Sequence, residues 1–395
     1  MATQVDTKNI GLRGIVVADS TICKVDGEAG RLVYRGFDAV TLAENSTYEE
    51  VVYLLLYDEL PSGTKLADFR EQISGYSSLP GQVVNTMKAI DLGTNTMEML
   101  QALVPLLAAH DPDLSNSNDK TATRRQAMRL IARMPLIVAA WHRLQQGHDV
   151  VEPDPKLSIA GNFLYTMHGK KPSQELEKDM DAILILHAEH SFNASTFTCR
   201  QVASTQAHIY AAVASAIGSL SGPLHGGANE RVKRMLDEIG TVDNVVPYVR
   251  KTLDEGGKIY GMGHAVYKVL DPRAKVLGPM AKRLADLTGD RKLYDLAVEV
   301  QKVTKEEFQA RKGVDLNANV DFFSATVYPM MGIPMELFTP IFALARTSGW
   351  CAHYIEERFA EAQPKPALYR PRAEYTGRYC GPDGCEWVPR DQRST

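Results

Sequence analysis

Apolar residues recur every three or four positions over most of the chain, the spacing at which one face of a helix turns toward a core. In residues 124–146, for example, Met128, Ile131, Met134, Val138 and Trp141 follow this spacing. The same pattern predicts helices over residues 175–200, 206–220, 229–239, 245–254, 274–287 and 294–312. Ser46 and Glu49 stand three apart before an apolar run, which predicts a capping box at a helix start.

Residues 20–37 follow a different pattern, typical of a short hairpin. Ile22 and Val25 precede the turn pair Asp26-Gly27, and Leu32 and Tyr34 follow it. Signals for strands nearly disappear after this region. The predicted fold class is therefore mostly α, with a short N-terminal β-hairpin.

The balance of apolar and charged residues changes along the chain at Gly222. From there to about residue 320 the chain is more charged, and apolar density rises again through residues 330–354. We interpret residues 1–222 as the first part of a large helical domain and residues 223–325 as a smaller inserted helical domain. Residues 326–395 then form the second part of the large domain and a Pro- and Arg-rich C-terminal arm.

Composition narrows the class of protein. The chain has 395 residues, 44% hydrophobic and 23% charged, with a net charge of −4. A nucleic-acid binder would normally carry a basic domain, so that class is disfavoured. No secretory leader or run long enough to span a membrane is evident, and the five cysteines are few and mostly scattered. We expect a cytoplasmic protein, without a disulfide or metal at Cys380 and Cys385.

Two histidines lie in unusual settings. His225 stands in Gly222-Pro-Leu-His-Gly-Gly227, and His264 follows Gly261-Met-Gly263. Glycines let the backbone approach a ligand closely and adopt positive φ, so both could be ligand-binding residues. Taken singly, each could equally be an ordinary loop histidine.

Asp321 is the third candidate, in Asn319-Val-Asp-Phe-Phe-Ser324. Apolar neighbours would desolvate its carboxylate, which raises the pKa and makes a better base. Asp321 could instead be a helix N-cap. His187 and His190 are three apart, but no third metal ligand is obvious, so we expect no metal and a hydrogen-bonding role for His190.

Several arginines could bind an anion. Arg346 lies in an apolar helical segment, where a guanidinium is costly unless it meets a carboxylate or phosphate. Arg273 follows Asp271-Pro272, and Arg370 and Arg372 flank Pro371. Simple solvent exposure is the alternative for Arg273 and Arg372.

Taken together, these segments resemble the citrate synthase family over nearly the whole chain. The matching stretches are Tyr34–Phe37, Ala188–Phe197, Gly222–Asn229, Gly261–Arg273, Asn319–Ser324 and Arg370–Arg372. The resemblance implies an acyltransferase that converts its acyl group to an alkyl group. It would condense acetyl-CoA with oxaloacetate in the tricarboxylic acid cycle and then hydrolyse the thioester.

The resemblance also implies roles. Asp321 matches the base that removes the methyl proton, His225 the donor to the thioester oxygen, and His264 the group that polarises and protonates the oxaloacetate carbonyl. His190, Arg273 and Arg346 match ligands of the dicarboxylate, whereas Arg370 matches an arginine contributed by the neighbouring subunit of a homodimer. Coenzyme A would be a co-substrate, with no permanently bound cofactor. Its phosphates would need cations, for which Lys258, Lys268, Lys275 and Lys312 are candidates.

Two alternatives stay open at this stage. The segments Tyr328–Pro334 and Phe338–Pro340 look somewhat like 2-methylcitrate synthases, which use propionyl-CoA through the same residues. One methylene changes binding by only about 1–3 kcal/mol, so dual specificity is possible. The second alternative, from another class, is a non-catalytic helical scaffold. The short chain resembles the dimeric class without the NADH site of larger relatives.

Overall fold

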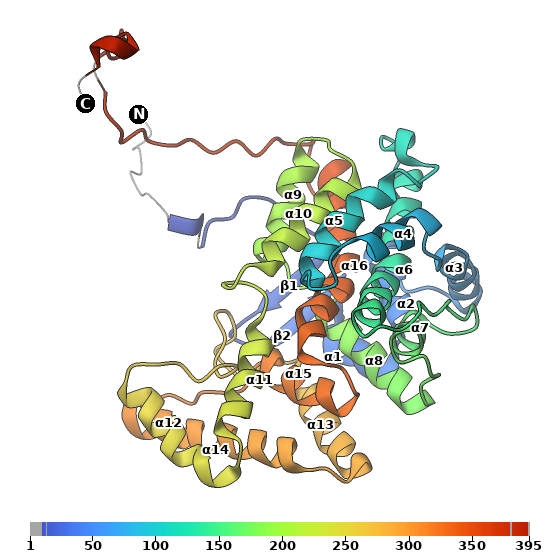
Figure 1. Cartoon of the computed structure of the whole chain (residues 1–395), viewed down its shortest axis with the longest axis vertical. Coiled ribbons are helices and arrows are strands. Elements are labelled where there is room, and N and C mark those ends of the chain that lie inside the picture. Colours follow the sequence, from blue (N-terminus) through green and yellow to red (C-terminus); the bar gives the residue numbers. More distant parts are fainter. Residues whose placement is uncertain (1–9, 13, 380, 394–395) are drawn as a thin grey trace.

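The computed structural model describes residues 10–12, 14–379 and 381–393, and within them it is mostly helical (Figure 1). This confirms the predicted fold class. The helices of the first part are α1 (Ala39–Asn45), α2 (Tyr48–Tyr57), α3 (Gly63–Tyr76), α4 (Gly81–Ala89), α5 (Thr96–Ala108), α6 (Lys120–Gln145), α7 (Ile159–His168), α8 (Gln174–His187), α9 (Ala194–Ser204) and α10 (Ile209–Ser221). The remaining helices are α11 (Ala228–Ile239), α12 (Val245–Asp254), α13 (Ala274–Thr288), α14 (Lys292–Lys312), α15 (Val320–Met330) and α16 (Phe338–Arg358). Short 3-10 turns connect several of them.

The predicted hairpin is present and gains a third strand. Strands β1 (Cys23–Asp26) and β2 (Arg31–Tyr34) pair antiparallel, and β3 (Phe37–Asp38) adds to β2. Leu32 and Tyr34 point into the core from β2 and are fully buried. The Tyr34 hydroxyl donates hydrogen bonds to the carbonyls of Ile185 and Glu189, so the sheet is tied to the end of α8.

Helix α16 lies at the centre of the molecule. It packs against α2, α6, α8, α9 and α10, and its residues from Ala343 to Glu357 are all buried. Helices α11 to α14 gather with α15 at one end of the molecule, at the bottom of Figure 1, where α13 and α11 both pack against α15. This end contains the segment that we interpreted as an inserted domain, and that division remains a prediction.

The structure corrects two predicted helix features. The helix predicted over residues 175–200 is broken, because α8 ends at His187 and α9 begins at Ala194. Ser191 adopts a left-handed φ of 53°, which a helix cannot continue, and Asn193 caps the new helix through Thr196 N–H. The predicted capping box at Ser46 and Glu49 is shifted by one residue.

Thr47 and Glu50 form the actual capping box of α2, each side chain bonded to the other residue's backbone N–H. Glu49 is therefore free to turn inward, where its carboxylate accepts the Ile159 N–H at 2.7 Å. Four of the predicted helices, over residues 229–312, begin and end within two residues of α11 to α14.

The C-terminal arm leaves the body after α16 in extended form, with one 3-10 turn at Arg390–Gln392 (red in Figure 1). Cys385 on this arm is disulfide-bonded, so the expectation of no disulfide was wrong for that residue. Cys380 lies outside the described residues. In the part of the chain that the structure describes, no helix combines the length and apolar character needed to cross a bilayer.

Candidate active site

Six of the residues singled out in the sequence line one cavity of about 550 Å³. They come from distant segments of the chain: His190, His225, His264, Arg273, Asp321 and Arg346. The break between α8 and α9, the loop before α11, the loop before α13, and helices α15 and α16 each supply at least one of them. This convergence is what makes the cavity a candidate active site.

His225 is held by the start of α9. Its Nε2 accepts the backbone N–H of Ser195 at 3.1 Å, so Nε2 carries no proton and Nδ1 must carry one. Ser195 Oγ lies 2.8 Å from the same Nε2 and accepts the indole N–H of Trp350 at 3.2 Å. Burial, followed by the charge of Arg346, lowers the pKa of His225 to about 4. The ring is therefore neutral, with Nδ1–H as its free donor.

His264 has the opposite tautomer. Its Nδ1 accepts the backbone N–H groups of Val266 at 3.0 Å and Tyr267 at 3.2 Å, which leaves Nε2 as the protonated nitrogen. Burial, followed by the charge of Arg273, lowers the pKa of His264 to about 4. The backbone thus fixes a neutral imidazole with one free N–H donor in each of the two glycine-rich loops.

Asp321 occupies the first turn of α15. Asn319 is the N-cap of this helix and accepts the N–H groups of Asp321 and Phe322, so the alternative that Asp321 itself is the cap was wrong. Its carboxylate is left for the cavity. Burial raises the pKa of Asp321 to about 6, against the opposing charge of Arg273. At neutral pH it is an ionised but more basic carboxylate than one in water.

The two lining arginines differ in their partners. Arg273 donates from Nε and Nη2 to both oxygens of Asp271, at 3.0 and 2.8 Å. Arg346 donates from Nε to the His187 carbonyl at 2.7 Å, and its buried Nη2 has no hydrogen-bond partner. A buried guanidinium N–H without a partner is costly, which suits a site that receives an anionic group.

His190 lies between these groups. Its Nε2 is 3.2 Å from the Tyr267 hydroxyl, and its ring lies 5.6 Å from that of His264. Burial, followed by the charges of Arg273 and Arg346, lowers its pKa well below the usual value. His187, in contrast, is fully buried and bonds the Ile183 carbonyl of its own helix.

The remaining candidates lie away from this cavity. Arg370 is exposed on the C-terminal arm and does not line its own chain's site. Lys258, Lys275 and Lys312 are exposed, and Lys268 forms an ion pair with Glu28. Of these four lysines, Lys268 lines a neighbouring cavity of about 280 Å³, which also borders His264 and Asn319.

Several residues that shape the site were not predicted from the sequence. Asp271 holds Arg273 and also accepts the Val320 N–H at 3.1 Å, which ties the loop before α13 to the start of α15. Ser195 and Trp350 hold His225. Asp271 had a usable signal, because an acidic residue two positions before an arginine can bind it bidentately. No local feature of the sequence indicated that Trp350 would contact the residues that hold His225.

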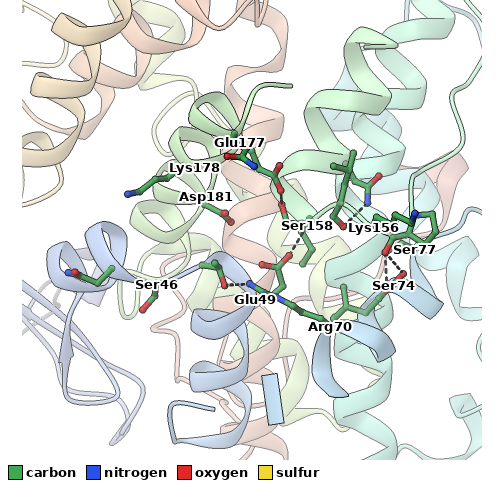
Figure 2. A pocket seen from close by; sticks show the side chains of 18 of the residues that line it. Ser46, Glu49, Arg70, Ser74, Ser77, Lys156, Ser158, Glu177, Lys178 and Asp181 are labelled. Atoms are coloured by element: carbon green, nitrogen blue, oxygen red, sulfur yellow. Dashed lines mark hydrogen bonds between the residues drawn. The ribbon is translucent and has the colours of Figure 1, made fainter. Parts of the chain in front are cut away.

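A second cavity of about 500 Å³ lies between α2, α3, α7 and α8. Figure 2 shows Glu49, Glu177 and Asp181 directed into the same space, with Arg70 at its edge. Asp181 accepts the Tyr48 N–H at 3.0 Å, and Ser158 donates to Glu177. Burial and the neighbouring Glu49 raise the pKa of Asp181 to about 8.

Comparison with known proteins identifies the family. The sequence model described as "Citrate synthase, C-terminal domain" matches residues 11–372. A citrate synthase from Haloferax volcanii is 41% identical over 97% of this chain and 98% of its own. A 2-methylcitrate synthase from Shewanella oneidensis is 37% identical over 93% of this chain and 94% of its own.

Solved structures agree with this result. The citrate synthase of Pyrobaculum aerophilum is 38% identical over 97% of this chain and 95% of its own, with a TM-score of 0.89. The Thermoplasma acidophilum citrate synthase, solved as a ternary complex with carboxymethyl coenzyme A and oxaloacetate, is 30% identical over 96% of this chain and 98% of its own, with a TM-score of 0.86. On these grounds, the chain belongs to the citrate synthase family.

Proposed function

We propose that the protein condenses acetyl-CoA with oxaloacetate and water, giving citrate and CoA. The observation that carries this proposal is the trio of Asp321, His225 and His264 around one cavity. A carboxylate with a raised pKa meets two neutral imidazoles whose free N–H donors are fixed by backbone hydrogen bonds. Abstraction of a weakly acidic proton needs such a base together with prearranged donors for the charge that develops.

The first step is removal of a methyl proton from acetyl-CoA by Asp321. A thioester methyl group is too weakly acidic for a carboxylate in water. The reaction becomes accessible when the developing enolate oxygen meets a fixed donor in a water-poor cavity. His225 Nδ1–H would be that donor. Because its Nε2 is already occupied by the Ser195 N–H, the ring cannot rotate to offer the other nitrogen without losing this bond.

The second step is attack of the enol carbon on the oxo carbon of oxaloacetate. His264 Nε2–H would donate to the oxo oxygen as negative charge develops there. Arg273 and Arg346 would bind the two carboxylates, with the unpartnered Arg346 Nη2 as an available donor, and His190 would add a hydrogen bond. Water then attacks the citryl thioester, and CoA leaves as the thiol.

The coenzyme would approach through the neighbouring cavity of about 280 Å³, which shares His264 and Asn319 with the active site. Lys268 at its border is the best placed of the proposed phosphate ligands, and Lys258, Lys275 and Lys312 are the others. No permanently bound cofactor or metal takes part in this chemistry. The Thermoplasma relative, whose complex contains a coenzyme A analogue and oxaloacetate, supports these substrates. A cytoplasmic enzyme of the tricarboxylic acid cycle is the matching cellular role.

We further propose a homodimer in which Arg370 reaches the neighbouring site. Its exposed position on an extended arm supports this placement. Mixed dimers of Asp321→Ala and Arg370→Ala subunits should recover about half of the wild-type activity per dimer, because one site receives both intact residues. Isolated mixed dimers as inactive as the parents would contradict the placement.

The deciding experiment for the reaction compares acetyl-CoA with propionyl-CoA, using release of free CoA thiol in the presence of oxaloacetate. We expect kcat/KM to be at least tenfold higher for acetyl-CoA. A strong preference for propionyl-CoA would instead assign 2-methylcitrate synthase, the reaction named for the Shewanella relative. No thiol release with either substrate would favour the non-catalytic scaffold.

A further inference from the structure

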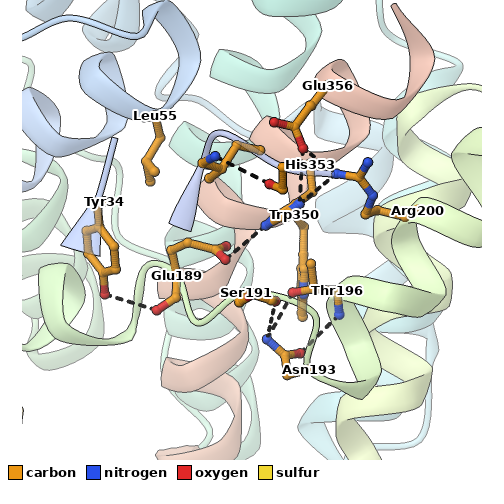
Figure 3. A network of polar contacts seen from close by, with 12 residues as sticks. Tyr34, Leu55, Glu189, Ser191, Asn193, Thr196, Arg200, Trp350, His353 and Glu356 are labelled. Carbon is orange, nitrogen blue, oxygen red and sulfur yellow. Dashed lines mark hydrogen bonds and ion pairs between the residues drawn. The ribbon is translucent and has the colours of Figure 1, made fainter. Parts of the chain in front are cut away.

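A chain of charged and polar side chains links the turn between α8 and α9 to helices α9 and α16 (Figure 3), and its members do not line the cavity of the candidate site. His353 Nε2 lies 2.9 Å from Glu189 Oε1, and Arg200 Nη1 lies 3.0 Å from His353 Nδ1. Arg200 also pairs with Glu356 at 2.5 Å and with Glu357 at 2.7 Å. All five side chains are at most 2% exposed. The proposed catalytic steps use none of them.

The direction of each hydrogen bond in this chain is fixed. A guanidinium only donates, so His353 Nδ1 accepts from Arg200 and carries no proton. The proton is therefore on Nε2, which donates to Glu189. His353 is a neutral connector that orients the Glu189 carboxylate, and Arg200 orients His353.

Glu189 belongs to the turn that presents His190. Its backbone carbonyl accepts the Tyr34 hydroxyl at 3.0 Å, and its side chain packs against α16 at Gly349. A Cβ at Gly349 would lie only 2.2 Å from Glu189 Oε2 and 2.4 Å from the Ala188 carbonyl oxygen. The turn and α16 are thus in direct contact, one turn of helix away from Arg346.

Arg346 needs a compensating charge. Arg273 has the Asp271 carboxylate as a bidentate partner, whereas Arg346 donates only to a backbone carbonyl. Burial lowers the pKa of Arg346, and the strongest opposing influence comes from the charge of Glu189. Glu189 is therefore the buried carboxylate whose charge most favours the charged form of the Arg346 guanidinium.

We infer that Glu189, held by His353 and Arg200, is a positioning residue for the dicarboxylate side of the site. It balances the buried Arg346 guanidinium and fixes the turn that carries His190. This inference rests on the proposed function, because it assigns the positioned groups to oxaloacetate. It implies that breaking the link at His353 harms oxaloacetate binding much more than acyl-CoA binding.

The test replaces His353 in two ways. His353→Leu retains side-chain bulk but removes both hydrogen bonds, whereas His353→Gln can accept from Arg200 and donate to Glu189. We expect the Leu variant to bind oxaloacetate about 10-fold more weakly by titration calorimetry, because small displacements of positioned groups have large effects. Its KM for acetyl-CoA should stay within twofold. The Gln variant should return to within about threefold of the wild-type oxaloacetate affinity.

Two further variants make the result interpretable. Thr304→Val removes a buried hydroxyl that bonds only its own helix, at the Val300 carbonyl, and should leave oxaloacetate binding unchanged. Tyr34→Phe removes only the hydroxyl that bonds the Glu189 and Ile185 carbonyls at the same turn, and it should weaken oxaloacetate binding about threefold. This variant provides a test if His353→Leu does not fold.

Each outcome separates the inference from the proposed function. Wild-type protein that binds no oxaloacetate would overturn the proposed function and this inference with it. Wild-type binding matched by folded His353→Leu would overturn the inference alone. An equal weakening of acetyl-CoA binding in His353→Leu would also overturn the inference, as would an oxaloacetate affinity that His353→Gln does not restore. If the Leu variant is unfolded, unchanged oxaloacetate binding in Tyr34→Phe would overturn it.

Discussion

Two cavities of nearly equal size, about 550 and 500 Å³, differ in what their buried polar atoms lack. In the candidate active site three unused donors, Arg346 Nη2 and one N–H on each of His225 and His264, share the cavity with the Asp321 carboxylate. In the second cavity the facing groups are carboxylates: one oxygen each of Asp181, Glu177 and Glu49 accepts a hydrogen bond from the protein, and the buried Glu49 Oε2 has no partner among the described residues (Figure 2). Volume therefore does not distinguish the two cavities, whereas the presence of unused donors beside a carboxylate does.

The pKa shifts follow the same division. In the candidate active site, burial keeps two imidazoles neutral and makes one carboxylate more basic, as the proposed proton transfer at neutral pH requires. In the second cavity, burial and the charge of Glu49 raise the pKa of Asp181, and Glu49 and Glu177 place further carboxylates around it. A shifted pKa indicates function only when the surrounding geometry provides a reaction.

The largest effect is expected for Asp321→Asn, which removes the base and leaves its size unchanged. We expect kcat to fall about 10³-fold, within the range for loss of a general base, while oxaloacetate affinity stays within about threefold. Steady-state CoA release and calorimetry measure the two quantities. Activity close to wild type would show that another group removes the proton.

The next largest effect is expected for Arg346→Lys. A lysine retains the charge but cannot offer two parallel N–H donors, and loss of a charged hydrogen bond costs about 1.5–3 kcal/mol. The KM for oxaloacetate should therefore rise about 10- to 100-fold, with a much smaller change for acetyl-CoA. Arg250→Lys is the matched control, because Arg250 is exposed and pairs with Glu307 on the surface. This substitution should change neither the KM for oxaloacetate nor the KM for acetyl-CoA.

The pH dependence gives a third test. Asp321 must be ionised to act as a base, and its pKa is about 6, so kcat/KM should fall about tenfold per pH unit below pH 6. His225 and His264 have pKa values of about 4 and stay neutral through this range. A profile that falls near pH 4 instead of pH 6 would contradict the desolvation of Asp321.

The smallest effect concerns the second cavity. The folded-state pKa of Asp181 is raised to about 8 from an ordinary value of 3.8, so the folded protein holds a proton that the unfolded chain releases. Stability from this group is complete below about pH 4 and is lost as the pH rises toward 8. Asp181→Asn should therefore raise the Tm at pH 8 by about 2 °C and by less at pH 5, without changing kcat/KM. An equal Tm shift at both pH values would contradict the raised pKa.

How well the sequence predicted a feature of this molecule depends on whether the residues that form it are close together or far apart in the sequence. Helices α11 to α14 follow from local periodicity, and their predicted bounds were close. The break at residues 188–193 was missed because the apolar spacing continues across it, and only the conformation of Ser191 and the cap at Asn193 reveal it. The Thr47–Glu50 cap was misplaced because Ser46 and Glu49 have the same spacing.

The site shows the same limit. The family resemblance pointed to the six lining residues, but it gave neither the tautomers of His225 and His264 nor the unpartnered state of Arg346. Those depend on backbone groups and side chains that are distant in the sequence. Trp350 reaches Ser195 across 155 positions, and His353 reaches Glu189 across 164.

The most direct test of the central claim is the stoichiometry of product to thiol. Acetyl-CoA labelled in its methyl carbon is incubated with oxaloacetate and the protein, and citrate is measured by NMR against the free CoA released. We predict one labelled citrate for each CoA thiol. Thiol released without citrate would show that the cavity only hydrolyses thioesters, and would contradict the assignment of Asp321, His225 and His264 to carbon–carbon bond formation.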